Sequence, residues 1–403
     1  MQHLSPTEAR MIAGIDAAAM LARIQRWCAI NSGTGNISGI GLLTEELAAA
    51  MAMLPGAVRW VDGATTPYID AEGREIERKF GQHLVLSVRP GANRRVLLTG
   101  HMDTVFPADH PFQTLKWLDA GTLNGPGVAD MKGGIAVMLA ALAAFETTPG
   151  ASQIGYDVLL NSDEEVGSPS SAPLIAELAA GKLAALTFEP AALPDGTLAG
   201  ERAGSGNYSV IIHGKSAHAG RNPQDGRNAI VAAAALVLAL KALDSEDLRI
   251  NPARIDGGSA NNVVPDLAVV RFNIRPQSSA DAAEFEVALK GLIDTIAAQH
   301  DLAIHRHGGL SRPPKPMDTP ALRLFELVRD CGAALGQDIR WQRSGGVCDG
   351  NNIAACGVPV VDTLGVRGGA IHSPDEYLLV ASLAERAALS ALILSRIADG
   401  AMS

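Results

Sequence analysis

Histidine and acidic residues stand at the ends of several segments that read as buried strands. His101 and Asp103 close an apolar run that begins at Val96. Residues i and i+2 of an extended segment face the same side, so Asp103 can hold the second ring nitrogen of a metal-bound His101. For a His-x-Asp pair alone, a surface His and Asp in a turn is the more common explanation.

Two further acidic positions can likewise be explained either by a structural role or by metal binding. Asp130 lies in the glycine-rich stretch Gly125–Gly134, before an apolar helix, where an aspartate is most often an N-cap. Asp163, Glu164 and Glu165 follow an apolar strand, and three consecutive acids there are costly unless solvated or neutralised by cations. Adjacent side chains diverge, so one glutamate can bind a metal while its neighbour addresses a water molecule.

Glu189 ends another strand-like run, and His372 lies in a glycine-rich loop near the C-terminus. Each alone is more often a capping or surface residue. Together with His101, Asp130 and the pair Glu164–Glu165, they form a set of nitrogen and oxygen ligands. If one aspartate bridges two ions, a histidine and a glutamate remain for each, which is enough for two catalytic zinc sites with room for water.

The elements that must position these residues alternate between helix-like and strand-like segments. This alternation predicts an α/β fold with a mixed, mostly parallel sheet, whose strand ends are where such folds place their sites. We expect strands at 83–88, 95–99, 156–161 and 184–188, and helices at 8–30, 42–54, 133–145, 171–180 and 379–397.

The pattern of predicted strands and helices changes after about residue 198. Strand-like runs at 207–213, 267–274 and 303–307, with helices at 225–243 and 279–299, predict an inserted α+β domain of two layers. The proline-rich stretch 312–316 leads back to the first domain. We therefore expect a discontinuous catalytic domain, residues 1–198 and 313–403, and an inserted domain at residues 199–312.

Composition excludes several classes of partner. The net charge is −10 and aromatic residues are only 4%, so we expect no nucleic-acid partner. A membrane-spanning helix needs about 20 apolar residues, more than any apolar run here, so we expect no membrane association. The N-terminus has no signal-peptide pattern, and the four cysteines lack metal-site spacing. We expect free, mostly buried thiols and a cytoplasmic location.

The chain resembles the zinc aminoacylase and carboxypeptidase family, which includes glutamate carboxypeptidase, acetylornithine deacetylase and succinyl-diaminopimelate desuccinylase. The resemblance extends in the same order over nearly the whole chain. The matching stretches are Thr99–Pro107, Gly125–Gly134, Ser162–Gly167, Phe188–Pro190, Gly214–Gly220, Asn262–Pro265, Ser344–Gly350 and His372–Pro374.

The resemblance implies two Zn²⁺ ions per chain, which Co²⁺ or Mn²⁺ can replace. It implies His101, Asp130 and Glu189 on one ion. It implies Asp130, Glu165 and His372 on the other, with Asp130 bridging the two.

Further roles follow from the same resemblance. Asp103 is expected to orient His101, and Glu164 is expected to be the general base. The inserted domain is expected to be a lid through which two chains form a homodimer. In this lid, His218 would stabilise the oxyanion in the partner's site, and Asn262 and Arg275 would contact a substrate carboxylate. Arg202 is the nearest candidate for contacting the substrate's side chain.

Three functions remain open on the sequence. The first is hydrolysis of an amide or peptide bond next to a free carboxylate. It is favoured because the amino-acid sequence around Glu164 and His372 resembles that of glutamate carboxypeptidase most. The second is deacylation of N-acyl amino acids such as acetylornithine or succinyl-diaminopimelate. The third, a catalytically inactive small-molecule binding protein, is disfavoured because a binder has no need of Glu164.

Overall fold

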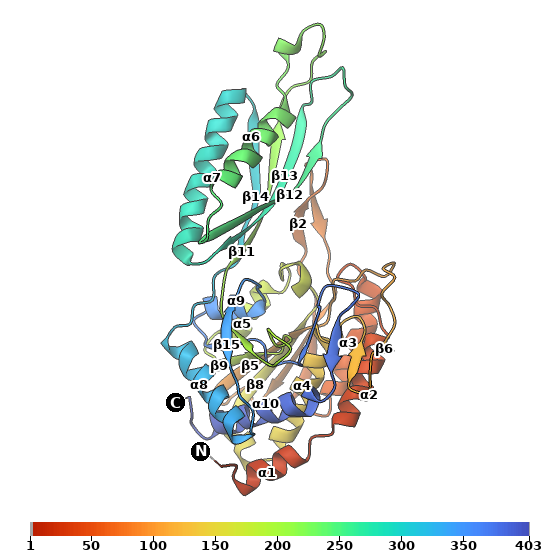
Figure 1. The fold of residues 1–403 in the computed structure, drawn as a ribbon, viewed down its shortest axis with the longest axis vertical. Coiled ribbons are helices and arrows are strands. Elements are labelled where there is room, and N and C mark those ends of the chain that lie inside the picture. Colours follow the sequence, from red (N-terminus) through yellow and green to blue (C-terminus); the bar gives the residue numbers. More distant parts are fainter. Residues whose placement is uncertain (1–2, 403) are drawn as a thin grey trace.

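A six-stranded sheet forms the base of the larger part of the molecule in the computed structural model, which describes residues 3–402 (Figure 1). In spatial order, the strands are β1 (Ala57–Val61), β4 (His83–Val88), β8 (Gly155–Asn161), β5 (Arg95–His101), β9 (Ala184–Thr187) and β16 (Val360–Val361). β8, β5, β9 and β16 are parallel, and β4 pairs antiparallel with β1 and β8. The predicted α/β class with a mixed, mostly parallel sheet is confirmed.

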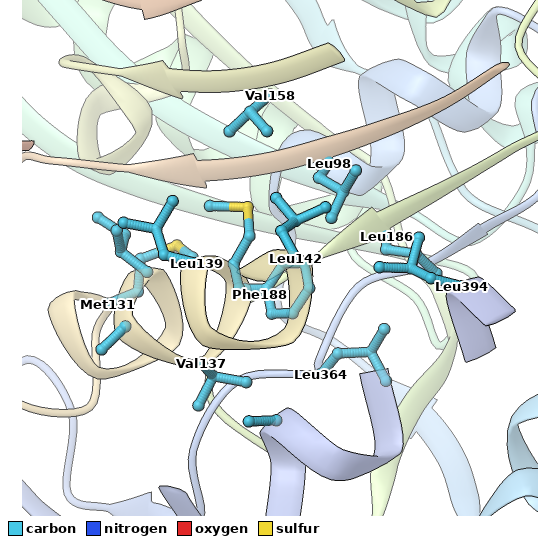
Figure 2. Packing of buried hydrophobic residues seen from close by; sticks show 14 of the residues in the cluster. Leu98, Met131, Val137, Leu139, Leu142, Val158, Leu186, Phe188, Leu364 and Leu394 are labelled. Carbon is cyan, nitrogen blue, oxygen red and sulfur yellow. The ribbon is translucent and has the colours of Figure 1, made fainter. Parts of the chain in front are cut away.

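Helices cover both faces of this sheet because its central strands are apolar on both sides. Leu98 of β5 and Val158 of β8 pack with Leu139 and Leu142 of α4, as Figure 2 shows, whereas Leu97 belongs to the core on the opposite face. One side carries α1 (Pro6–Ala13), α2 (Ala17–Cys28), α3 (Ile37–Met51), α4 (Lys132–Glu146), α8 (Thr319–Ala334) and α10 (Ser382–Ala398). The other side carries α5 (Ala172–Ala179) and α9 (Asp349–Ala355).

Two glycines let the start of α4 pack closely, Gly134 against the residue after β9 and Gly133 against the loop before the helix. A Cβ on Gly134 would lie 1.9 Å from the carbonyl oxygen of Phe188, and one on Gly133 would lie 2.3 Å from that of Val128. Any larger residue would therefore push the helix away. This close approach places Asp130, just before α4, beside Glu189, just after β9.

Two small sheets hold the remaining loops around the strand ends. One contains β17 (Gly368–Gly369), β18 (Tyr377–Leu379), β7 (Thr122–Asn124) and β6 (Lys116–Trp117). It links the loop carrying His372 to the segment before Asp130. The other pairs β10 (Leu198–Arg202) with β15 (Trp341–Ser344) in parallel.

The inserted segment forms a separate antiparallel sheet, here called the lid. Its strands lie in the order β12 (Leu248–Gly257), β13 (Leu267–Pro276), β11 (Ser205–His213) and β14 (Ala303–Arg312). Its helices, α6 (Ala229–Ala242) and α7 (Ser279–His300), pack on one face over a core that includes Val270 and Leu236. This is the two-layer arrangement expected from the sequence, with β12 as an additional strand.

A hairpin of the larger domain reaches up to the other face of the lid sheet (Figure 1). It consists of β2 (Thr66–Ile69) and β3 (Glu75–Arg78). Ile69 packs against Ile211 and Val269 of the lid. Arg271 donates hydrogen bonds from Nη2 to the carbonyl oxygens of Ile69 (2.9 Å) and Asp70 (2.7 Å). The lid is thus held by a non-covalent contact as well as by its two connecting strands.

Other sequence predictions have mixed outcomes. All four cysteines are free and three of them are buried, as expected. Within residues 3–402, no helix has the length and apolar character needed to cross a membrane. The single helix expected at 8–30 is instead two helices, α1 and α2, interrupted at Gly14.

Candidate metal centre

The predicted ligands meet at one edge of the central sheet because their strands are parallel. β5 ends at His101, Glu165 follows β8, and Glu189 follows β9, all at the carboxyl ends of these strands. Asp130 and His372 enter the same place on loops before α4 and between β17 and β18. Five residues spread over 272 positions of sequence are thus brought together.

Asp130 lies between the two histidines and offers one oxygen to each. Its Oδ1 is 3.0 Å from Nε2 of His101, and its Oδ2 is 3.2 Å from Nε2 of His372. Its peptide bond to Met131 is cis. A carboxylate in this position can bridge two cations, and the bridging role that the family resemblance implies for Asp130 stays a prediction.

A glutamate completes each side of the bridge. Oε2 of Glu189 is 3.6 Å from Nε2 of His101, and Oε2 of Glu165 is 3.1 Å from Nε2 of His372. Zinc bonds of about 2.0–2.2 Å in tetrahedral geometry put neighbouring ligand atoms about 3.3 Å apart. The four nitrogen–oxygen separations of 3.0–3.6 Å are compatible with bound cations. Among residues 3–402, the groups whose ligand atoms all lie within 4.8 Å of one another are His101, Asp130 and Glu165, and His101, Glu164 and Glu189.

The clustered carboxylates raise the pKa values of both histidines. Hydrogen bonds to Asp130 and Glu165 raise the pKa of His372 to about 11. Burial alone would lower the pKa of His101, but Glu189, Asp103 and Asp130 together raise it well above its ordinary value. Protons here neutralise clustered carboxylates, and a divalent cation would displace them because ligand imidazoles must be neutral.

Asp103 has two tasks in this geometry. Its backbone oxygen lies 3.0 Å from Nδ1 of His101, and its Oδ1 lies 3.4 Å from the same nitrogen. Its carboxylate also accepts hydrogen bonds from the backbone N–H groups of Glu164 (3.1 Å) and Glu165 (3.2 Å). The fully buried Asp103 therefore fixes both a histidine and the glutamate pair.

Glu164 lines the same cleft, and it also lies close enough to His101 and Glu189 for these three residues to hold one cation. The family resemblance assigns it the role of base instead. It is buried, and its Oε1 lies 2.7 Å from Nη2 of Arg312. Burial raises the pKa of its carboxyl well above the ordinary value, and the positive charge of Arg312 opposes that rise. A buried carboxyl with a raised pKa beside a metal-ligand cluster has the properties of a group that exchanges protons.

Glu376 is a positioning residue that the sequence patterns missed. Its carboxylate accepts backbone hydrogen bonds from Gly127 (3.1 Å), Ala129 (2.9 Å) and Asp130 (3.0 Å). It thereby fixes the loop that presents the bridging aspartate. In the sequence, only its position four residues after His372 indicates that Glu376 lies near the site.

The cleft beside these carboxylates has a volume of about 600 Å³. Asp130, Glu164 and His372 line it together with Arg202 and Tyr377. Arg202 is nevertheless occupied, because its guanidinium forms a buried two-point ion pair with Asp362 at 2.7 and 3.1 Å. Its part in substrate selection stays a prediction.

The three lid residues lie at two different ends of the lid. His218 and Asn262 are exposed neighbours near its tip, where Ala219 donates to the backbone oxygen of Asn262. Arg275 is half-buried at the end of β13 nearest the catalytic domain, where burial and the nearby Arg312 lower its pKa. None of the three lines the cleft of the metal-ligand residues.

Comparison with known proteins agrees with this geometry. Residues 97–396 match Peptidase family M20/M25/M40. Carboxypeptidase G2 of Pseudomonas sp. (strain RS-16) is 29% identical over 95% of this chain and 90% of its own. A succinyl-diaminopimelate desuccinylase of Xanthomonas oryzae pv. oryzae (strain PXO99A) is 31% identical over 75% of this chain and 83% of its own.

Solved structures share the fold. A tripeptidase of Staphylococcus aureus superposes with a TM-score of 0.71 at 25% identity, covering 96% of this chain and 99% of its own. An M20 family metallo-carboxypeptidase of Sulfolobus solfataricus gives 0.69 at 15% identity, covering 93% and 98%. The family match spans most of the chain and includes every predicted metal ligand, so this chain belongs to the M20/M25/M40 peptidase family and is a metallohydrolase.

Proposed function

We propose that this protein hydrolyses an amide or peptide bond next to a free carboxylate, in the manner of a glutamate carboxypeptidase. The observation that carries the proposal is Asp130, which presents one oxygen to each of two His–Glu pairs beside Glu164. The likeness to carboxypeptidase G2 over 95% of the chain supports this choice of substrate class.

Each chain would hold two divalent ions, zinc by default. Bound ions would polarise the scissile carbonyl and lower the pKa of the attacking water towards about 7. Glu164 would take a proton from that water and pass it to the leaving amine. Asp103 and Glu376 would keep the imidazole of His101 and the loop of Asp130 in place throughout.

A deacylase of N-acyl amino acids is the second candidate, favoured by the 31% identity to a succinyl-diaminopimelate desuccinylase. Purified zinc-loaded protein should be assayed against N-acyl-glutamates, dipeptides, acetylornithine and succinyl-diaminopimelate. We expect the highest kcat/KM for N-acyl- or peptidyl-glutamate. Preference for acetylornithine or succinyl-diaminopimelate would establish the second candidate. Turnover of none of them would favour the inactive binding protein.

We further propose that two chains form a homodimer through their lids. Residues 229–240 of α6 contain no charged side chain, and Val231 and Leu238 are 51% and 73% exposed. Such an apolar helix face is suited to a second copy of itself. The free thiols are compatible with a cytoplasmic location, which stays a prediction.

The length of the lid limits which of its residues can contact the same substrate molecule. Eight residue steps along β13, from Leu267 to Arg275, span about 26 Å. Asn262 lies beyond the start of that strand, so one substrate molecule cannot contact Asn262 and Arg275 of the same chain. We propose that Arg275 serves its own chain, whereas His218 and Asn262 serve the partner's site.

Subunit exchange tests this arrangement. Glu164→Gln and His218→Ala homodimers should each be nearly inactive. Mixed dimers should regain activity, because one of their two sites would carry both defects and the other neither. Activity would be followed as the two variants are mixed, with exchange monitored by labelled subunits. Exchange without recovery would show that His218 does not act in the partner's site.

Replacing Arg275 should weaken substrates that carry the carboxylate. Hydrogen bonds to a charged group contribute about 1.5–3 kcal/mol, so Arg275→Ala should raise KM roughly ten- to a hundredfold. The matching carboxamide substrate should lose much less. Arg249→Ala is the control, because Arg249 is the exposed neighbour of Arg275 across the β12–β13 pair. Equal losses for both substrates would contradict carboxylate binding by Arg275.

A further inference from the structure

Arg312, the last residue of β14, extends from the lid into the interior of the catalytic domain. Only 4% of the residue is exposed. Its Nη2 lies 2.7 Å from Oε1 of Glu164 and donates to the backbone oxygen of the same residue at 3.0 Å. The same nitrogen lies 2.9 Å from Oγ of Ser168 and 3.2 Å from Oδ1 of Asp349. One guanidinium therefore contacts Glu164 twice and the bend that follows it.

The surroundings of Glu164 explain why it needs such a partner. Ser168 donates a hydrogen bond to Asp349, so the loop after β8 and the start of α9 are joined at Arg312. Glu189 and Asp349 add further negative charge to the environment of Glu164. A buried carboxylate without a cation would move away from these neighbours or toward a ligand position.

The two segments that connect the lid to the catalytic domain, here called the hinge, are held together around Arg202 and Lys315. Arg202 and Lys315 exchange backbone hydrogen bonds of 2.9 and 3.0 Å, and both side chains pair with Asp362. On the lid side, the β11–β14 register is irregular between the Ser205 and Gly206 pairings. Arg312 stands between this anchored segment and the irregular one, so its position is set by the hinge.

We propose that Arg312 is a positioning residue that holds the general base Glu164 from the hinge strand. The inference rests on the proposed function, in which Glu164 is the base. Arg312 pairs electrostatically with Oε1 and donates a hydrogen bond to the backbone oxygen, so Oε2 would accept the proton of the attacking water. The lid's attachment point thereby helps to assemble the catalytic geometry.

Steady-state kinetics of zinc-loaded Arg312→Lys and Arg312→Gln test the proposal. Lysine keeps the charge without the planar fork, so kcat should fall roughly tenfold, and roughly a hundredfold in Arg312→Gln, which approaches loss of the base. KM should change less than about threefold, and both variants should keep two ions per chain. Arg306→Gln, on the exposed part of the same strand, should have unchanged kcat.

A double-mutant cycle separates positioning from a general structural effect. If Arg312 acts through Glu164, Glu164→Gln/Arg312→Gln should be no slower than Glu164→Gln alone. Additive losses, or normal kcat in folded Arg312→Lys, would overturn the proposal. Should Arg312→Gln fail to fold, Glu164→Gln/Arg312→Lys completes the cycle. Full activity of Glu164→Gln would instead refute the proposed base itself, which distinguishes the two failures.

Discussion

Replacing Glu164 with glutamine should lower kcat by at least about a hundredfold, the low end of general acid–base contributions. The amide keeps the size of the side chain but cannot accept the proton of the attacking water. Because the proposed ligand sets do not include Glu164, two ions per chain should remain and KM should change little. Steady-state kinetics together with metal analysis of the same samples would measure both effects.

Glu177→Gln provides the matched control for this variant. Glu177 lies on α5 with a largely exposed side chain, so the same substitution there should leave kcat unchanged. A near-normal rate in Glu164→Gln would show that another group transfers the proton. Loss of metal from Glu164→Gln would show instead that Glu164 is a ligand.

Replacing Asp130 with alanine should abolish activity, because both ligand sets lose their shared member. Its two oxygens face His101 at 3.0 Å and His372 at 3.2 Å. We expect binding of both ions to weaken together. By contrast, Glu189→Ala and Glu165→Ala should each affect mainly one ion.

Metal analysis at controlled free zinc, with circular dichroism to confirm folding, would distinguish these patterns. Asp130→Asn is the conservative companion, since it keeps the shape of the side chain and removes its charge. A folded Asp130→Ala protein that retains two tightly bound ions would refute the bridging position of Asp130.

The parts of the fold that the sequence predicts well are those buried on both sides of the sheet. The expected strand at 83–88 coincides with β4, and the five predicted metal ligands lie together, His101, Glu165 and Glu189 at strand ends and the other two on loops. In such segments, local pattern and burial agree. The predicted family is confirmed by the match of residues 97–396 to Peptidase family M20/M25/M40.

The missed strands depend on contacts that the sequence does not display. β12 contains Pro252, which argues against a central strand but is tolerated here because β12 is an edge of the lid sheet. The hairpin of β2 and β3 is short and largely exposed, and Ile69 is buried only because the lid covers it.

The missed site residues have a similar cause. Arg312 stands at the start of a proline-rich stretch that indicates a linker, whereas its side chain reaches 148 residues back to Glu164. Glu376 acts on the backbone of a loop 246–249 residues away. Short motifs identify ligands through their own chemistry, but they cannot identify groups that act only through tertiary contacts.

Activity as a function of bound metal tests the central claim of a two-metal hydrolase most directly. Protein freed of metal by a chelator would be titrated with zinc while hydrolysis of an N-acyl-glutamate and the ions bound per chain are measured together. We expect no activity without metal, and recovery that reaches its maximum at two ions per chain. Full activity in the metal-free protein would contradict the proposed mechanism.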